Sequence, residues 1–240
     1  MTELAKGDLV LTDKNQYEKV YAFAHKDTDK SAQFLTIYTE DERLVPLEVS
    51  AEHLLFLEGR NNPVRADSIR VGDNLQGASN AKKVAKIGKI KRKGIYAPLT
   101  VSGTLVVNGV VASNYASLIQ DTMSAEGGWV VELLQENMHR YIHQGMSPFR
   151  LYCSLSEENL CTVYSDFGKP YFVEFGVKIT NAVVAKMIGL QLLYLAGFFA
   201  IAGTTSIVEK IRFGPCGFLS LICVTYLLIQ RKKTQFSKTK

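Results

Sequence analysis

Short apolar runs separated by polar turns occupy the first 115 residues. Four of them are rich in β-branched and aromatic residues, as strands are: residues 9–11, 20–23, 34–38 and 54–57. Asn108-Gly109 separates two further apolar runs, which predicts a type I′ hairpin because both turn residues then need positive φ. Long helical periodicity is absent before residue 115, so this part of the chain is predicted to be mainly β.

A short motif occurs twice, 65 residues apart. Residues 4–11 and 69–75 each hold an apolar anchor, a Gly-Asp pair (Gly7-Asp8, Gly72-Asp73) and the start of a strand. Glycine and aspartate are typical turn residues. The repeat predicts two similar β halves related by a pseudo-two-fold axis, together forming a domain over residues 1–116.

The pattern changes after residue 116. Apolar residues then recur at helical spacing and predict an amphipathic helix that ends near Gly145: Trp129, Val130, Leu133, Leu134, Met138, Tyr141 and Ile142. We assign this helix and a linker to residues 117–182. Within the β domain, residues 82–93 carry seven basic side chains between apolar ones. A strand with one solvated lysine face is the preferred interpretation, and an anion site is the alternative.

Two uncharged apolar runs follow, at residues 187–208 and 213–230. A bilayer core needs about 20 apolar residues in a helix, so residues 183–230 are predicted to be a membrane hairpin, or one span with an interfacial helix. A buried hairpin of a globular domain is the alternative. With two spans, residues 1–180 lie on the same side as the tail. With only 213–230 spanning, they face the lumen or the outside.

The net charge of +5 comes from the tail. Residues 231–240 hold five basic side chains and no acid, while residues 1–230 hold 23 of each sign. A tail does not provide the basic face that binds nucleic acid, so a nucleic-acid partner is not expected. By the positive-inside tendency the tail is cytoplasmic. Four cysteines without a CxxC pair disfavour a disulfide scaffold and a zinc ribbon, and we expect no cofactor.

Few residues suit catalysis. Ser50 and His53 lie three apart on a turn before a strand, where a hydroxyl can polarise a carbonyl and an imidazole can transfer a proton. On spacing alone, a histidine that only caps the strand is the simpler interpretation. His139 and His143 lie at i and i+4 and could chelate a metal, but no third ligand is evident, so we expect no metal site.

Parts of the first 116 residues resemble the autoprocessing (Hint) domain of hedgehog proteins. Three pieces carry the resemblance in order: Ala-Pro-Leu-Thr at residues 97–100, Gly-Thr-Leu-Val-Val at 103–107 and Val-Ala-Ser at 111–113. Looser similarity extends to about residue 155. The resemblance implies the fold of inteins, with two pseudo-symmetric β subdomains, in agreement with the repeat.

The resemblance also implies self-cleavage. In the family a cysteine at the first position of the domain attacks the preceding carbonyl, and a sterol hydroxyl or water then takes the acyl group from the thioester. The family's Thr-x-x-His turn corresponds to Ser50 and His53 here, which implies a carbonyl polariser and a general acid. An aspartate that serves as base in the sterol step aligns with His25. A second family cysteine corresponds to Asn114, a neighbour of unassigned role.

The chain departs from the family in one major respect. The family's nucleophile precedes the segment that matches Leu4 by some twenty residues, and this sequence starts at Met1. We therefore expect an incomplete copy, either a fragment or a degenerate domain, that autoprocesses an upstream peptide in cis. A sterol and the membrane are the expected partners, in the secretory pathway or at the cell surface. The alternative is a non-catalytic, membrane-anchored interaction module.

Overall fold

A computed structural model describes residues 1–41, 43, 45–117, 136–155 and 161–175, together with positions 178, 200, 204 and 207. In chain order its elements are as follows: β1 (Leu9–Leu11), β2 (Tyr17–Lys19), β3 (Ala22–Thr39), β4 (Leu47–Val49), β5 (His53–Leu55), β6 (Val64–Arg65), the 3₁₀ helix η1 (Ala66–Ser68), β7 (Asn74–Leu75), β8 (Lys82–Leu99), β9 (Thr104–Val107), β10 (Val110–Ala116), α3 (Met138–Gly145) and α4 (Ser147–Leu155).

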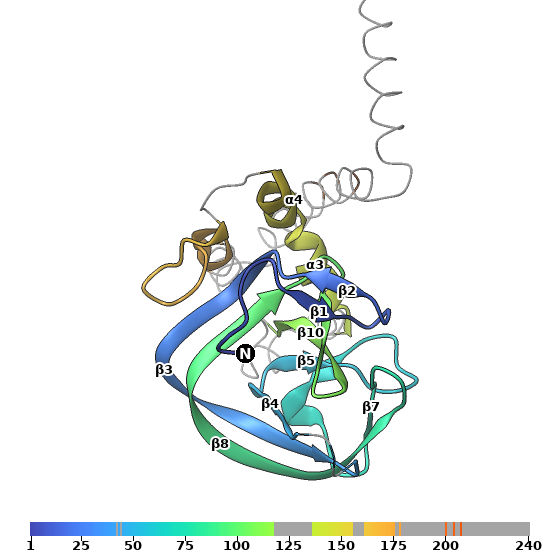
Figure 1. The fold of residues 1–240 in the computed structure, drawn as a ribbon. Coiled ribbons are helices and arrows are strands. Elements are labelled where there is room, and N and C mark those ends of the chain that lie inside the picture. Colours follow the sequence, from blue (N-terminus) through green and yellow to red (C-terminus); the bar gives the residue numbers. More distant parts are fainter. Residues whose placement is uncertain are drawn as a thin grey trace, which may run out of the picture.

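The described strands form antiparallel sheets, so the predicted mainly β fold is confirmed. β1 pairs with β2, one four-stranded sheet has the order β6-β5-β10-β9, and the other has the order β4-β3-β8-β7. Figure 1 shows β3 and β8 curving side by side around one edge of the molecule, with α3 and α4 against its opposite end. The two sheets enclose the core between them, and the helices close one side of it.

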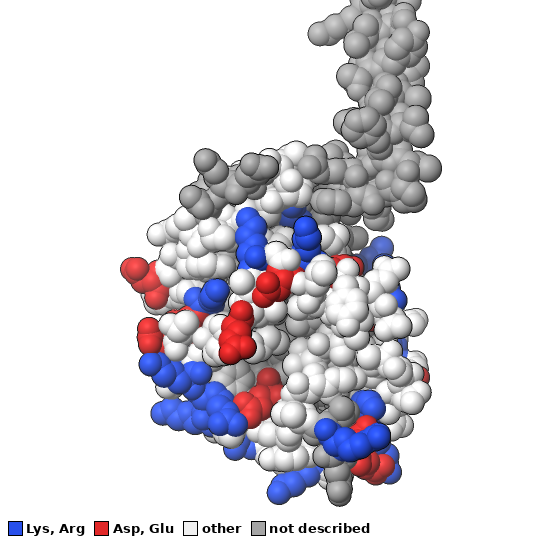
Figure 2. All heavy atoms as spheres, viewed as in Figure 1, with Lys and Arg blue, Asp and Glu red and all other residues white. Residues whose placement is uncertain are grey.

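β3 and β8 are the longest strands, with 18 residues each. They pair antiparallel from Ala22↔Leu99 to Thr39↔Val84. The predicted strand at 34–38 and the end of the one at 20–23 are parts of this single strand β3. The lysine-rich strand is confirmed as the first part of β8. Several of its basic side chains form ion pairs with acidic ones, for example the bidentate pair of Arg92 with Glu48. Figure 2 shows side chains of both charges along this edge of the molecule.

The repeated Gly-Asp motif forms the same turn twice. The Asp8 carboxylate accepts the N–H of Ala5 and the Asp73 carboxylate accepts the N–H of Arg70, each at 2.8 Å. Gly7 and Gly72 have φ of 98° and 95°. Each turn is then held to a later strand by a reciprocal backbone pair, Gly7 and Asp8 with Val20, and Gly72 and Asp73 with Val84. The pseudo-symmetry predicted from the sequence thus extends to individual hydrogen bonds.

The Asn108-Gly109 hairpin is also confirmed. β9 and β10 pair from Val107↔Val110 to Thr104↔Ser113. Asn108 and Gly109 have φ of 49° and 79°, the left-handed region that the type I′ turn requires. The hairpin brings β10 next to β5, and this places residues 112–116 beside the turn that holds His53.

Two apolar clusters form the core. One lies between the sheets around Ile37, Leu55 and Leu75. The other joins Leu54 and Leu99 to residues of α3 and α4, including Phe149. Burial of apolar area stabilises both clusters, by about 25 cal/mol per Å². The second cluster attaches the segment beyond β10 to the β sheets, at the end of the molecule where β5 begins.

Several predictions lie partly or wholly outside the described residues. α3 ends at Gly145, where the predicted amphipathic helix ends, but that helix's predicted beginning at 129 is not described. The two predicted membrane runs also lie outside the described residues, apart from positions 200, 204 and 207. Within the described part of the chain, no helix is long and apolar enough to cross a bilayer. The domain limits at 116, 182 and 230 stay predictions.

Candidate active site

His53 is held by two segments of backbone. Its N–H donates to the carbonyl of Ser50 at 3.1 Å, which closes the turn before β5. Its ring Nε2 lies 2.9 Å from the carbonyl oxygen of Ser113 on β10. A carbonyl can only accept, so the neutral ring carries its proton on Nε2. The lone pair of His53 is therefore on Nδ1.

An irregularity in β10 frees the Ser113 carbonyl for this contact. β10 pairs with β5 at Ala112↔Leu55 and again at Ala116↔His53, so β10 has two more residues than β5 between these pairs. Such a bulge removes carbonyls from the ladder and redirects them. The geometry of the sheet therefore determines the tautomer of His53 in the folded chain.

The surroundings of His53 affect its protonation. Burial lowers the pKa of His53 below the ordinary histidine value, and the hydrogen bond to Ser113 partly opposes this effect. The ring is consequently neutral near pH 7 and has a bare Nδ1. A neutral imidazole in this form can accept a proton from a nearby acid and then donate it as a strong acid.

Ser50 precedes His53 in the turn, and Asn114 follows Ser113 in β10. The side chains of Ser50 and Asn114 differ in their contacts. Ser50 is partly exposed, and within the described residues its hydroxyl makes no hydrogen bond. Asn114 is buried, and its Nδ2 donates to Oγ1 and O of Thr100 at 3.0 and 3.3 Å. Ser50 thus contacts His53 through its backbone carbonyl, whereas Asn114 follows the residue that contacts the His53 ring and ties β10 to Thr100.

A second layer of polar residues from α3 supports Ser113. The fully buried Ser113 hydroxyl contacts His139 Nδ1 at 2.9 Å and accepts the N–H of Tyr115 at 3.0 Å. The hydroxyl of Tyr115 contacts His143 Nδ1 at 3.0 Å. Burial, the Arg150 charge, His139 and Lys14 lower the pKa of His143 to about 3. The carbonyl that orients His53 is therefore anchored by a hydrogen-bonded network in which His143 is neutral and accepts contacts from the Arg150 guanidinium.

The same contacts bear on the metal-binding alternative for α3. The His139 and His143 rings stack in parallel, with centroids 5.9 Å apart, and their Nδ1 atoms engage Ser113 and Tyr115. Among the described residues, no three His, Cys, Asp or Glu side chains are grouped as metal ligands are. The two histidines hold β10 in place instead.

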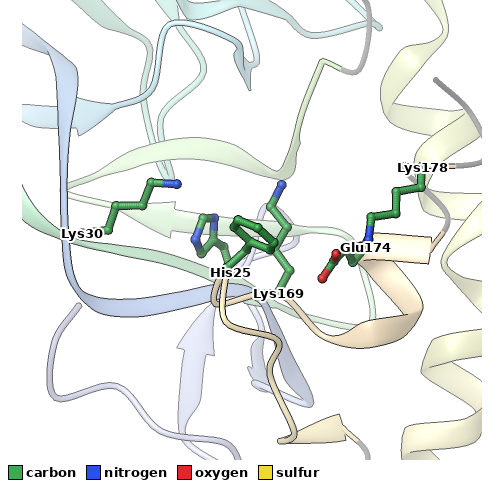
Figure 3. Close-up of a pocket in the computed structure, with 6 residues that line it drawn as sticks. His25, Lys30, Lys169, Glu174 and Lys178 are labelled. Atoms are coloured by element: carbon green, nitrogen blue, oxygen red, sulfur yellow. Dashed lines mark ion pairs between the residues drawn. The ribbon is translucent and has the colours of Figure 1, made fainter. Parts of the chain in front are cut away.

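His25 lies on β3, in the other four-stranded sheet. The backbone of Phe167 lies beside its ring, and its buried Nε2 has no partner among the described residues. Burial and the charges of Lys169 and Lys30 lower the pKa of His25, while Asp27 raises it. Figure 3 shows His25 between Lys30 and Lys169, and no described contact links it to His53.

Comparison with known families decides what this arrangement belongs to. The model of the Hint module matches residues 1–170, which is more than half of the chain. The chain belongs to the Hint module family. Protein hedgehog of Drosophila erecta is 30% identical to this Hint module over 167 residues, which cover 64% of the chain and 32% of that protein.

The comparisons give two further likenesses. Protein qua-1 of Caenorhabditis elegans is 29% identical over 144 residues, which cover 49% of this chain and 12% of that protein. Among solved structures, that of the gp41-1 intein covers 47% of this chain and 84% of its own, at 22% identity and a TM-score of 0.37. The module thus resembles the hedgehog type, and it spans about a third or less of the length of these curated relatives.

Sequence reasoning missed two features of this Hint module. Ser113 acts through a backbone carbonyl, and only its place at the end of the Val-Ala-Ser piece could have drawn attention to it. Cys153 and Cys161 form a disulfide between α4 and the segment at 161–175. They are eight residues apart, and the sequence alone does not show that their chain segments come together.

Proposed function

We propose that this Hint module carries out hedgehog-type autoprocessing on a peptide joined to its N-terminal side. The observation that carries the proposal is the hydrogen bond from His53 Nε2 to the Ser113 carbonyl, which leaves Nδ1 as a base. A thiol placed beside that nitrogen would lose its proton to it and become nucleophilic. Family membership supports the same reaction class, since hedgehog proteins are among the relatives.

The first step is an acyl shift with a balanced proton transfer. The thiol sulfur attacks the carbonyl carbon that precedes its cysteine, and its proton passes to His53 Nδ1. The C–N bond then breaks while His53 returns the proton to the departing nitrogen, which leaves a thioester. Ser50, whose hydroxyl has no partner among the described residues, is proposed to polarise the carbonyl oxygen.

In the second step, an acceptor hydroxyl attacks the thioester carbon. We propose His25 as the base, because its buried Nε2 has no partner among the described residues and can accept a proton. The hydroxyl proton goes to Nε2, the C–S bond breaks, and the thiolate regains a proton. A sterol hydroxyl or water is the proposed acceptor, following the family. Asn114 is proposed to hold β10 to Thr100 during both steps.

We propose that the thiol is none of the four cysteines of the sequence. Cys153 and Cys161 are joined in a disulfide. The other two, Cys216 and Cys223, lie in the second apolar run, outside the described residues. The proposal therefore places the nucleophile on the N-terminal side of residue 4, at the start of the domain, as in the family.

The disulfide also bears on the compartment. Disulfides persist in oxidising compartments, of which the secretory pathway is one. Of the two topologies open from the sequence, a single span at 213–230 puts residues 1–180 in the lumen when the basic tail is cytoplasmic. We propose this topology, with the module held at the membrane surface of the secretory pathway.

A fusion protein tests the reaction. A reporter domain followed by a Cys-led strand is joined to Met1, and the fusion is treated with hydroxylamine, which cleaves thioesters without reducing disulfides. We expect release of the reporter with a C-terminal hydroxamate, detected by mass spectrometry. An intact fusion that is folded, as judged by its circular dichroism, would overturn the proposal and favour a non-catalytic module.

A further inference from the structure

A cavity of about 260 Å³ lies beside His25. One side is β3, and the other is formed by residues 167–174 and Lys178, which follow the disulfide in the chain. The two sides are in direct contact, since the N–H of Lys26 donates to Gly168 O at 2.7 Å. Gly168 has φ of 70°, and a Cβ on it would lie 2.8 Å from the carbonyl oxygen of Lys26. Only glycine fits this contact, so the cavity is a built feature of the fold. Its lining comprises His25, Lys30, Phe167, Lys169, Glu174 and Lys178.

The cavity has an unbalanced positive charge. Glu174 is its one carboxylate, and Lys178 pairs with it at 2.6 Å. Lys30 and Lys169 have no ion pair within the described part of the chain. Figure 3 shows both beside His25, whose Nε2 is also without a described partner. Two unpaired lysine side chains and the His25 imidazole therefore line one small space.

This combination fits a phosphate group. Ammonium groups bind phosphate oxygens through short, charge-assisted hydrogen bonds. The His25 Nε2 can accept a hydrogen bond from a protonated phosphate oxygen or an adjacent hydroxyl. An apolar ligand would bury these charged groups without replacing the water they lose, which is costly. The volume is also below the about 300–1,000 Å³ of pockets for drug-sized ligands, so a headgroup fits better than a whole lipid.

The surrounding surface favours a lipid as the source of the phosphate. Aromatic side chains on the same segment are exposed to solvent: Phe167 by 61%, Tyr171 by 60%, Phe172 by 42% and Phe175 by 65%. Exposed apolar side chains next to basic ones are typical of surfaces that lie against anionic membranes. We propose that the cavity beside His25 binds the phosphate of an anionic phospholipid headgroup. This proposal does not depend on autoprocessing.

Nuclear magnetic resonance of isotope-labelled histidines in the full chain tests it. The probes are inorganic phosphate and detergent micelles doped with phosphatidylglycerol. We expect both to shift the His25 resonances and leave those of His53 unchanged, which also reports that the fold is intact. Binding should be tighter to the doped micelles than to inorganic phosphate.

Variants separate the cavity from general charge. We expect K30A/K169A to weaken binding by about tenfold or more, since each charge-assisted hydrogen bond contributes on that order. Lys169→Arg keeps the charge and should keep binding. The matched control K89A/K91A removes two exposed lysines of β8 that do not line the cavity, and binding should be unchanged.

Three results would overturn the proposal. Equal weakening in K30A/K169A and in K89A/K91A would mean that only the overall charge matters. Equal binding to micelles doped with a fatty acid would remove the phosphate requirement. Binding of inorganic phosphate as tight as that of phosphatidylglycerol would make a soluble phosphate compound the ligand in place of a lipid.

Discussion

His53 and His25 differ in which ring nitrogen the fold leaves free. His53 donates from Nε2 to the carbonyl of Ser113 and keeps the lone pair on Nδ1, whereas Nε2 of His25 is buried without a partner among the described residues. The bulge in β10 sets the arrangement at His53. Each imidazole is a base when neutral, and at His53 a backbone carbonyl determines which atom can react.

The two histidines differ also in their electrostatic surroundings. Burial alone lowers the pKa of His53, and the hydrogen bond to Ser113 raises it in part. The pKa of His25 is lowered by burial and by the charges of Lys169 and Lys30. The pKa of a ring beside unpaired ammonium groups changes when anions bind or salt is added, whereas the pKa of a ring among neutral groups does not. The comparison indicates that nearby charge affects the protonation of His25 more than that of His53.

The largest expected effect separates the two roles. His53→Ala should slow hydroxylamine-dependent cleavage of the fusion by about 10²–10⁴-fold, the usual contribution of a proton-transfer group. His25→Ala should leave that cleavage unchanged and reduce transfer to the natural acceptor, because hydroxylamine needs no base of the protein. Both rates are measured by mass spectrometry. If the two variants have equal effects on hydroxylamine cleavage, the division of roles is wrong.

A pH titration of stability examines the network behind His53. The pKa of His143 in the folded chain is about 3, below its ordinary value. As the pH falls, the unfolded chain therefore takes up this proton at a higher pH than the folded chain does. Stability from this group is complete above about pH 6.5 and is lost as pH falls toward 3. His143→Gln should lower the slope of unfolding free energy against pH by about 1.4 kcal/mol per unit between pH 6 and 4.5.

Urea unfolding at several pH values gives this slope. The His143→Gln side chain does not titrate and can still accept a hydrogen bond from the Tyr115 hydroxyl. The control is therefore that the variant is folded at pH 7. An unchanged slope would show that His143 is protonated in the folded chain, and the network behind Ser113 would then not be neutral.

The disulfide supports the His25 side of the molecule. Chain-entropy arguments give a loop of this size about 2–3 kcal/mol of stabilisation. C153A/C161A should lower the unfolding free energy by about that amount and weaken phosphate binding beside His25, since Phe167 and Lys169 follow Cys161. Hydroxylamine cleavage at His53 should persist. C216A/C223A is the matched control, and an equal loss of stability in it would contradict the assignment.

The parts of the fold that could be predicted are the turns whose backbone conformation only certain residue types adopt. Asn108-Gly109 and the two Gly-Asp turns require positive φ, so the residues identify the turns. The full length of β3 was not predictable, because polar residues 26–33 interrupt its apolar pattern. Apart from residues 28–30, where the pairing shifts, this stretch is held by main-chain pairing with β8, which places little demand on side chains.

The site was predictable to a similar extent. The resemblance to the hedgehog family, with the spacing of Ser50 and His53, identified the turn that the structure places beside β10. The role of Ser113 was not predictable, since any residue supplies a carbonyl. The cavity at His25 joins β3 to residues more than 130 positions later, and local patterns contain no information about such contacts.

The smallest expected effect concerns Asn114, the neighbour of Ser113 in β10. Its side chain donates to Thr100, which accepts through its hydroxyl and its carbonyl. Asn114→Ala should therefore lower the unfolding free energy by about 1–2 kcal/mol, the cost of leaving buried polar atoms without partners. Thr100→Val removes one of the same contacts from the other side, so the double variant should cost less than the sum of the two.

Cleavage decides whether Asn114 does more than this. A residue that only ties β10 to β8 affects the rate through the population of folded chains, so at 20 °C below the melting temperature hydroxylamine cleavage should stay within about threefold of the parent. A residue that contacts the thioester would change the rate in fully folded protein, while Thr100→Val would not. A tenfold loss in Asn114→Ala alone would move Asn114 from the support of the site into its chemistry. The distinction between His53 and its surroundings would then have to include a second reacting side chain on β10.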